Sequence, residues 1–423
     1  MQLPTELFFR IMEACATLYA ERLAEQDNHF PIAQGFESLS TVALDAFKKD
    51  LTSWLLVSVD WRDFCLSATQ LWASIAILRP LPEDIARVKL WLKRSKTHPL
   101  TIRLEQSEFP EITEAQTTQK LINIFVSERL RWRKVSFELY SCPQIDIQSS
   151  VEMEHLGYAS LALSSRDWIQ EKVHTLWTDI FRASSSLNKI GFSISFSPFD
   201  LNLWQNIPWK NLNFIDLCLS IEIEIAIDLL RLCESVEVFC LHEIVPDGNR
   251  GEHNPGQLKK LFVLRNLHSL SLSTSKAELA LLLRCIMAPN LQRVKIHYDS
   301  MARVGHIEDG VELEGLVLRS QLGLRSLRIT CSNVRGENFQ SMSFLSSSAM
   351  QSLQELAIHC SDDLMFALTA PTWNHTEGYF LPNLKCVGLC GHTAGKTKVW
   401  LNDVANLRRG VKVVDLNCGV YVT

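Results

Sequence analysis

Apolar residues recur in a fixed pattern over more than half of the chain. An apolar residue is followed by two variable positions, a second apolar residue, one variable position and a third apolar residue; we call these six positions the hexad. Apolar side chains at alternate positions predict a half-buried strand, because side chains along a strand point to opposite faces in turn. Nine hexads follow one another at intervals of 24 to 33 residues, beginning at Leu187, Leu212, Val236, Leu267, Leu291, Leu324, Leu353, Leu384 and Val411.

Helix-like stretches separate the hexads. Residues 277–287 read AELALLLRCIM and are followed by Pro289 before the next hexad. One strand–helix unit cannot bury its apolar face alone, but stacked units share a continuous core. The intervals are typical of leucine-rich repeats. The sequence therefore predicts an α/β solenoid over residues 98–423, with parallel strands on its concave face and helices on its convex face.

The repeat extends more faintly toward the N-terminus. Earlier units are expected to start near Leu71, Leu100, Trp132 and Met153. Val88 and Leu92 fall on one face of a linker helix predicted within residues 79–97. Alternating apolar residues predict strands at 75–77 and 100–104, one on each side of this helix.

The first 78 residues follow a different pattern. Pro4 suits the first turn of a helix, and Leu7 and Ile11 lie one turn apart on one side of it. Further on, a Val-x-x-x-Trp-Arg segment at 57–62 precedes a Leu-Trp pair at 71–72. The order of these residues resembles the F-box, an all-helical motif. The matching residues are Leu3, Pro4, Glu6, Leu7, Ile11, Val57, Trp61, Arg62, Leu71 and Trp72.

The match to the F-box departs from the family in two places. Ser58 stands where the family often has cysteine, and 54 residues separate Leu3 from Val57, about twice the usual number. An insertion at about 16–50 explains the spacing, and a surface loop of that length costs little closure entropy. Together with the helix and strand at 88–104, the chain resembles fungal F-box proteins with C-terminal leucine-rich repeats.

This resemblance implies a substrate-recognition subunit of an SCF-type ubiquitin ligase, and no catalysis by the chain itself. The F-box-like module would bind a Skp-type adaptor and, through it, a cullin–RING ligase, while the repeats would bind a target protein. The residues that would bind the adaptor, or support its binding, are Leu3, Pro4, Leu7, Ile11, Val57, Trp61 and Trp72. The alternative is a non-catalytic protein-binding scaffold, in which the helical start only caps the solenoid.

The hexad also predicts which side chains would meet a target. Positions 1, 4 and 6 face the core, so positions 3, 5 and 7 line the other face of the sheet. In neighbouring repeats these positions place Arg293, Lys295, His297 and Arg328 together as a basic patch for an acidic or phosphorylated segment. Two readings stay open beside it, an ordinary solvated sheet face and recognition by the polar loops 245–257 and 302–314.

Composition narrows the possible partners and compartment. The chain has 42 basic and 47 acidic residues, so it lacks the basic excess that nucleic-acid-binding proteins usually show. No apolar run approaches the length of a membrane helix, and no basic stretch precedes an apolar run at the start. Twelve cysteines are scattered without paired spacing, which favours free thiols and a cytoplasmic or nuclear protein.

Candidate chemistry is sparse. Residues 391–397 read GHTAGKT, with three residues between the glycines where a phosphate-binding loop needs four. Cys386, Cys390 and His392 lack the second close pair of ligands that a zinc site requires. We therefore expect no cofactor, no metal and no nucleic-acid or membrane partner.

Overall fold

A computed structural model describes much of the chain and divides it into two compact units. Unit 1 comprises Met1–Ser197 with Asn202–Pro208, and unit 2 comprises Pro198–Leu201 with Trp209–Thr423. The described residues are 56, 58–141, 152–163, 180, 184–194, 207–245, 261–274, 279–298, 307–320, 323–331, 344–345, 347–359, 368, 381–390, 411–415 and 421–422.

Unit 1 contains a parallel sheet whose strands follow chain order. The strands are β1 (Ser74–Leu78), β2 (Leu100–Glu105), β3 (Trp132–Leu139), β4 (Tyr158–Leu163) and β5 (Lys189–Ile194). The helices are α3 (Val59–Ser67), η1 (Thr69–Trp72), α4 (Pro82–Ser95), α5 (Ile112–Ser127) and η2 (Arg129–Arg131). Alternate side chains such as Ile102 and Leu104 are buried, as the period of a half-buried strand requires.

The start of the repeat pattern is confirmed in this unit. β1 pairs with β2 in parallel, so the strand predicted around Ile75 and Ile77 belongs to the parallel sheet of unit 1. α4 lies within the predicted linker segment and connects these two strands, with Val88 and Leu92 buried beneath it. The first strand–helix unit of the repeat therefore precedes residue 98.

Unit 2 continues the same alternation. Its main strands are β6 (Phe214–Glu222), β7 (Val238–Val245), β9 (Ser269–Thr274), β11 (Arg293–Tyr298), β12 (Ser326–Cys331), β13 (Glu355–His359), β14 (Cys386–Cys390), β15 (Lys412–Asp415) and β16 (Tyr421–Val422). All neighbours in this order are parallel except β15 and β16. The helices are η3 (Trp209–Asn211), α7 (Ile223–Leu232), α8 (Ala280–Cys285), α9 (Ile307–Leu318) and η5 (Ser348–Met350).

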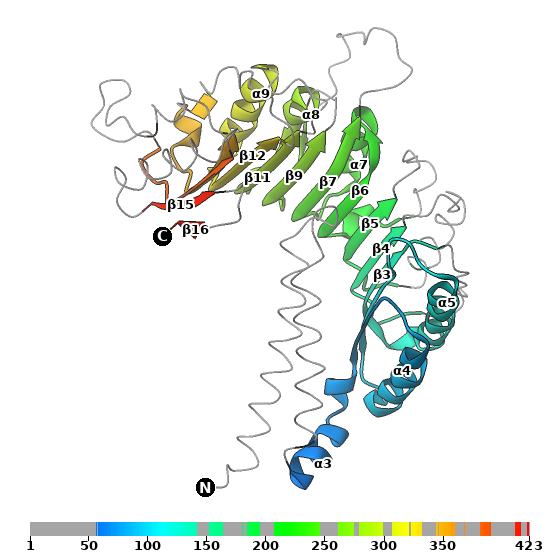
Figure 1. Ribbon diagram of the computed structural model, residues 1–423. Coiled ribbons are helices and arrows are strands. Elements are labelled where there is room, and N and C mark those ends of the chain that lie inside the picture. The colour runs from blue at the N-terminus through cyan, green and yellow to red at the C-terminus, as the bar shows by residue number, and fades with distance from the viewer. Residues whose placement is uncertain are drawn as a thin grey trace. The chain divides into compact units, whose positions relative to one another are not determined.

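The helices of unit 2 cover one face of its sheet. Figure 1 shows α7, α8 and α9 side by side along the strands from β6 to β12. β8 (Phe262–Val263) and β10 (Ile286–Met287) form a separate two-stranded parallel sheet within the segments that connect the main strands. The predicted α/β fold of parallel strands and helical returns is thus confirmed for the described residues. Within them, every helix is too short or too polar to span a bilayer.

The hexads locate the strands closely. In each of the eight hexads from Leu187 to Leu384, a strand begins two residues after the first hexad position. These strands are β5, β6, β7, β9, β11, β12, β13 and β14. The ninth prediction is wrong by one residue. Lys412 pairs with Cys386, which places the last hexad at Gly410 rather than Val411. Val411 and Val414 fit the predicted register and Val413 fits the shifted one, and a shift of one residue exchanges the two faces.

Polar side chains link successive repeats just before three of the strands, β11, β13 and β14. Asn290 Nδ2 donates to the Arg265 carbonyl at 2.7 Å, and Asn383 Nδ2 donates to the Gln351 carbonyl at 2.8 Å. Ser352 makes the equivalent bond to Leu324. All three donors immediately precede a hexad, and each binds a backbone oxygen of the preceding repeat.

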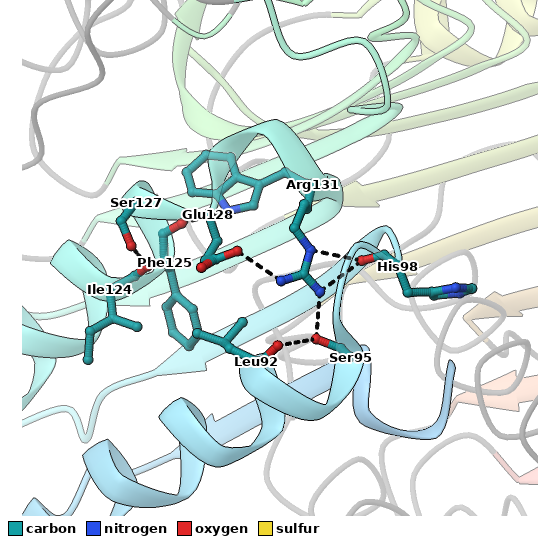
Figure 2. A network of polar contacts seen from close by, with 9 residues as sticks. Leu92, Ser95, His98, Ile124, Phe125, Ser127, Glu128 and Arg131 are labelled. Atoms are coloured by element: carbon teal, nitrogen blue, oxygen red, sulfur yellow. Dashed lines mark hydrogen bonds and ion pairs between the residues drawn. The ribbon is translucent and has the colours of Figure 1, made fainter. Parts of the chain in front are cut away.

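Arg131 provides the corresponding link in unit 1. Its guanidinium donates to the His98 carbonyl from both Nε and Nη2, at 3.1 and 3.0 Å. The Nη2 group also lies 2.5 Å from Ser95 Oγ, and Nη1 pairs with Glu128 at 2.8 Å. Figure 2 shows the side chain reaching from the start of β3 to the end of α4. One half-buried cation therefore connects two consecutive strand–helix units.

Candidate functional site: the polar sheet face of unit 2

The face of the unit 2 sheet opposite the core carries polar side chains; we call it the polar sheet face. In β9, Leu270 and Leu272 are buried while the three serines that alternate with them are only half-buried. The same alternation runs through β11, where Val294 and Ile296 are buried. The hexad thus assigned the two faces of the sheet correctly in these strands.

The predicted basic residues lie together on this face. Arg293, Lys295 and His297 occupy alternate positions of β11, and Arg328 on β12 is in register with Lys295. Parallel strands in register place such side chains about 5 Å apart. Arg293 and Arg328 are exposed, whereas Lys295 and His297 are half-buried. We call these four residues the basic cluster.

Lys295 is the electrostatic centre of the basic cluster. Burial lowers the pKa of its amine, and the neighbouring Arg328 guanidinium lowers it further, because both disfavour a second positive charge. Cys240 and Asp216 act in the opposite direction without reversing the shift. The positive charges of the cluster therefore repel one another, and a bound anion would reduce this repulsion.

Hydroxyl groups surround the basic cluster. Ser271 is in register with Lys295 on one side, and Ser326 is in register with Arg293 on the other. His297 Nδ1 lies 2.9 Å from Thr330 Oγ1, which orients the imidazole between the two strands. Hydroxyl and guanidinium groups are donors for carboxylate or phosphate oxygens. An exposed carboxylate, Glu355, follows Ser326 in the same row and limits the cluster on that side.

An acid–histidine pair that is largely shielded from solvent lies on β6 and β7, and the sequence did not predict it. His242 Nε2 lies 2.6 Å from Asp216 Oδ1, and their side chains are only 11% and 6% exposed. The two strands shift register between Leu217 and Ser220, so that β6 has an extra residue opposite His242. Such bulges re-aim side chains. Asp216, Cys240, Ser271 and Lys295 are in register across four strands. The carboxylate of this row, Asp216, is therefore already paired with His242.

Cys240 lies beside this pair but is poorly suited to nucleophilic chemistry. Burial raises the pKa of its thiol, and the Asp216 carboxylate raises it further. Lys295 and a hydrogen bond from Ser271 only partly offset this. A thiol rather than a thiolate predominates at neutral pH, and the thiol is the weaker nucleophile. The polar sheet face is therefore better suited to binding than to catalysis by Cys240.

Most of the predicted adaptor-binding residues lie outside the described part of the chain. These are Leu3, Pro4, Leu7, Ile11 and Val57, with the insertion predicted at about 16–50. The backbone of Trp61 lies within α3. Their placement therefore stays a prediction.

Trp72 is the predicted adaptor-binding residue whose surroundings are described. It is 2% exposed, and its indole N–H donates to the Cys65 carbonyl at 2.7 Å. Trp91 of α4 meets it edge-on at 5.5 Å between ring centroids, and the Arg94 guanidinium lies 4.3 Å above the ring. Trp72 therefore fastens η1 to the first repeat, and any part it has in binding is to support the residues before it.

The structure describes only part of the two polar loops that were the alternative recognition sites. The predicted polar loop 302–314 is in part a helix, because α9 begins at Ile307; Leu313, Leu316 and Val317 form its buried stripe. Most of the loop 245–257 lies outside the described residues. In the parts that the structure describes, no three histidine, cysteine or acidic side chains gather as they would around a metal.

Comparisons with known proteins do not assign the chain to a family. No family model matches it, and no curated protein matches its sequence.

Proposed function

We propose that the chain is the substrate-recognition subunit of an SCF-type ubiquitin ligase. Its F-box-like residues bind a Skp-type adaptor, and its leucine-rich-repeat solenoid binds a target protein. The receptor does no chemistry itself. It raises the effective concentration of the target beside the ubiquitin-transfer machinery, as tethering of two partners does.

The observation that carries this proposal is the direct connection between the F-box-like segment and the repeat. The Trp61-Arg62 segment forms part of α3, η1 follows, and Trp72 packs against α4 of the first repeat. Only Ala73 separates η1 from β1. A receptor needs such a short connection, because a target held on a slack tether would not be aimed at the ligase.

The basic cluster supports the second half of the proposal. Two exposed arginines and a half-buried lysine on adjacent strands form a rigid, positively charged surface. An acidic or phosphorylated segment of the target would bind it through charge-assisted hydrogen bonds. Sites on regular secondary structure hold such donors in place before the ligand arrives.

Co-purification with a Skp-type adaptor tests the proposal. The tagged chain is expected to retain the adaptor and the cullin through repeated washing at moderate salt. A chain with its repeats folded that retains neither would overturn the ligase proposal. A fragment starting at residue 98 is no suitable control, because β1 and α4 belong to the sheet.

A scaffold without a role in ubiquitination is the second candidate, and the burial of Trp72 favours it. A cap for the first repeat would need the indole to lie inside, as it does, at 2% exposure. The two functions differ in what the first helix contacts. Substitutions at Leu7 and Ile11 would unfold the first repeats if the helix is a cap, and would only abolish adaptor binding if it belongs to an F-box.

A further inference from the structure

Lys295 differs from the other basic residues of the polar sheet face in how it is held. Its in-register neighbours are Ser271 on β9 and Arg328 on β12, so the amine projects from the middle of a row across the sheet. The side chain is half-buried, whereas Arg293 and Arg328 are exposed. Lys295 is thus flanked by guanidinium groups while being partly withdrawn from water.

This setting raises the uncharged fraction of the amine above that of an ordinary lysine. Burial and the Arg328 charge both lower the pKa of Lys295. An ordinary lysine, with a pKa near 10.4, is almost wholly protonated at neutral pH, and each unit of lowering raises the reactive fraction about tenfold. The nearest carboxylate in the row, Asp216, is already held by His242 at 2.6 Å. A lysine near another cation is a recognised form of activated amine.

The two arginines beside Lys295 would also bind an anionic reagent. Arg293 lies two residues before Lys295 on the same side of β11, and Arg328 lies beside it on β12. Guanidinium groups bind phosphate oxygens in a bidentate way. A phosphate held between them would keep the rest of its molecule close to the Lys295 amine, and such proximity accelerates a reaction without any further group.

We propose that Lys295 is an acyl-acceptor site for acyl phosphates. The Nζ atom attacks the acyl carbon, and a C–N bond forms. The bond between that carbon and the phosphate oxygen breaks, inorganic phosphate leaves, and the amine proton passes to water. The product is a neutral amide, so acylation removes the central charge of the basic cluster and weakens its hold on an anionic partner. This chemistry does not depend on the ligase proposal.

Acetyl phosphate is the probe, applied to the full-length chain at neutral pH. Acetylation of each lysine is followed over time by peptide mass spectrometry, with exposed Lys89 of α4 as the internal reference. We expect Lys295 to be acetylated faster than Lys89, because its amine is less fully protonated and lies beside guanidinium groups that bind the phosphate. Equal or slower acetylation of Lys295 would overturn the proposal.

Two further arms separate the anion site from the amine. Added inorganic phosphate should slow acetylation at Lys295 and leave Lys89 unchanged. Arg328→Gln should slow Lys295 in the same way; because Arg328 is exposed, the variant is expected to fold, and its unfolding transition is measured alongside. An uncharged acetylating ester should show a smaller preference for Lys295. Indifference of Lys295 to both phosphate and Arg328→Gln would show that no anion site directs the reaction.

Discussion

Two tryptophans show how single side chains close the helices of unit 1. The Trp132 indole N–H donates to the Phe125 carbonyl at 3.0 Å, as Trp72 does to Cys65 at 2.7 Å. In both cases the acceptor lies seven residues earlier, near the end of a helix whose last carbonyls have no partner within it. The sequence predicted that Trp72 binds the adaptor or supports its binding, but it did not predict the contact with Trp91, because a Leu-Trp pair does not reveal burial.

Arg131 supplies the first prediction at this scale. Replacing it with methionine should lower the free energy of unfolding by about 2 kcal/mol, because the charged bonds to Ser95, His98 and Glu128 are lost in a setting only 15% exposed. Denaturant titration of the purified variant measures this.

Arg231→Met is the matched control. Arg231 also forms an i,i+3 pair, with Asp228, but their side chains are 32% and 50% exposed. Solvent screening should keep its effect within about 0.5 kcal/mol. Equal losses in the two variants would show that the burial of Arg131 does not matter.

Glu138 gives the second prediction at this scale, a dependence on pH. Burial and the adjacent Glu105 carboxylate raise its pKa above the usual 4.5. The folded state therefore holds the proton more tightly than the unfolded state, and this residue lowers stability as the pH rises through that range. Glu138→Gln should raise the denaturation midpoint at pH 7, with the gain vanishing below about pH 4.5.

The exposed Glu234 serves as the control for Glu138. Glu234→Gln should leave the midpoint nearly unchanged at both pH values. A Glu138→Gln variant that is less stable than the parent at pH 7 would contradict the assigned cause of the shift.

At the scale of elements, the sequence predicted the positions of the strands more accurately than those of the helices. A half-buried strand repeats every two residues, so the hexad fixes its place and its two faces. The predicted helix at 277–287 is shorter, since α8 ends at Cys285 and the next two residues pair with β8. α9 was missed because its buried stripe lies among glycines and charged residues. The Asp216–His242 pair depends on a bulge that no periodicity reveals.

Gly323 provides a test of the turn before β12. Its φ is +72°, and a Cβ there would lie 2.6 Å from Ser352 Oγ, which itself binds the Leu324 carbonyl. Gly323→Ala should cost about 1–2 kcal/mol from the left-handed backbone alone, with the clash in addition. Thermal or denaturant unfolding measures the loss.

Gly157 lies directly before β4, and a Cβ there would meet nothing within 4 Å. Gly157→Ala should change the stability by no more than about 0.5 kcal/mol. If both alanine variants are equally stable, the turn at Gly323 is not constrained as described.

At the scale of the whole molecule, the sequence predicted the parallel α/β repeat and the members of the basic cluster. It could do so because equal hexad positions in neighbouring repeats come into register, as Lys295 and Arg328 do. The N-terminal module rests on the resemblance of scattered residues, and their contacts depend on long-range packing that spacing alone does not specify.

The basic cluster makes the first prediction at this scale. Arg293→Glu with Lys295→Glu should abolish retention of those partners that bind the polar sheet face, because the charge of the surface is inverted. Lys89→Glu with Lys93→Glu makes the same charge change on an exposed part of α4 and should retain them. Proximity labelling of the parent and both variants measures this, and identical partner sets would move recognition away from the cluster.

The most direct measurement of the ligase proposal is calorimetric binding of a purified Skp-type adaptor to the intact chain and to the Leu7→Asp, Ile11→Asp double variant. Unfolding of both proteins is recorded in parallel. The account predicts saturable one-to-one binding by the parent, no detectable binding by the variant, and the same unfolding transition of the repeats in both. Absence of binding by a well-folded parent, or unfolding of the repeats in the variant, would contradict it.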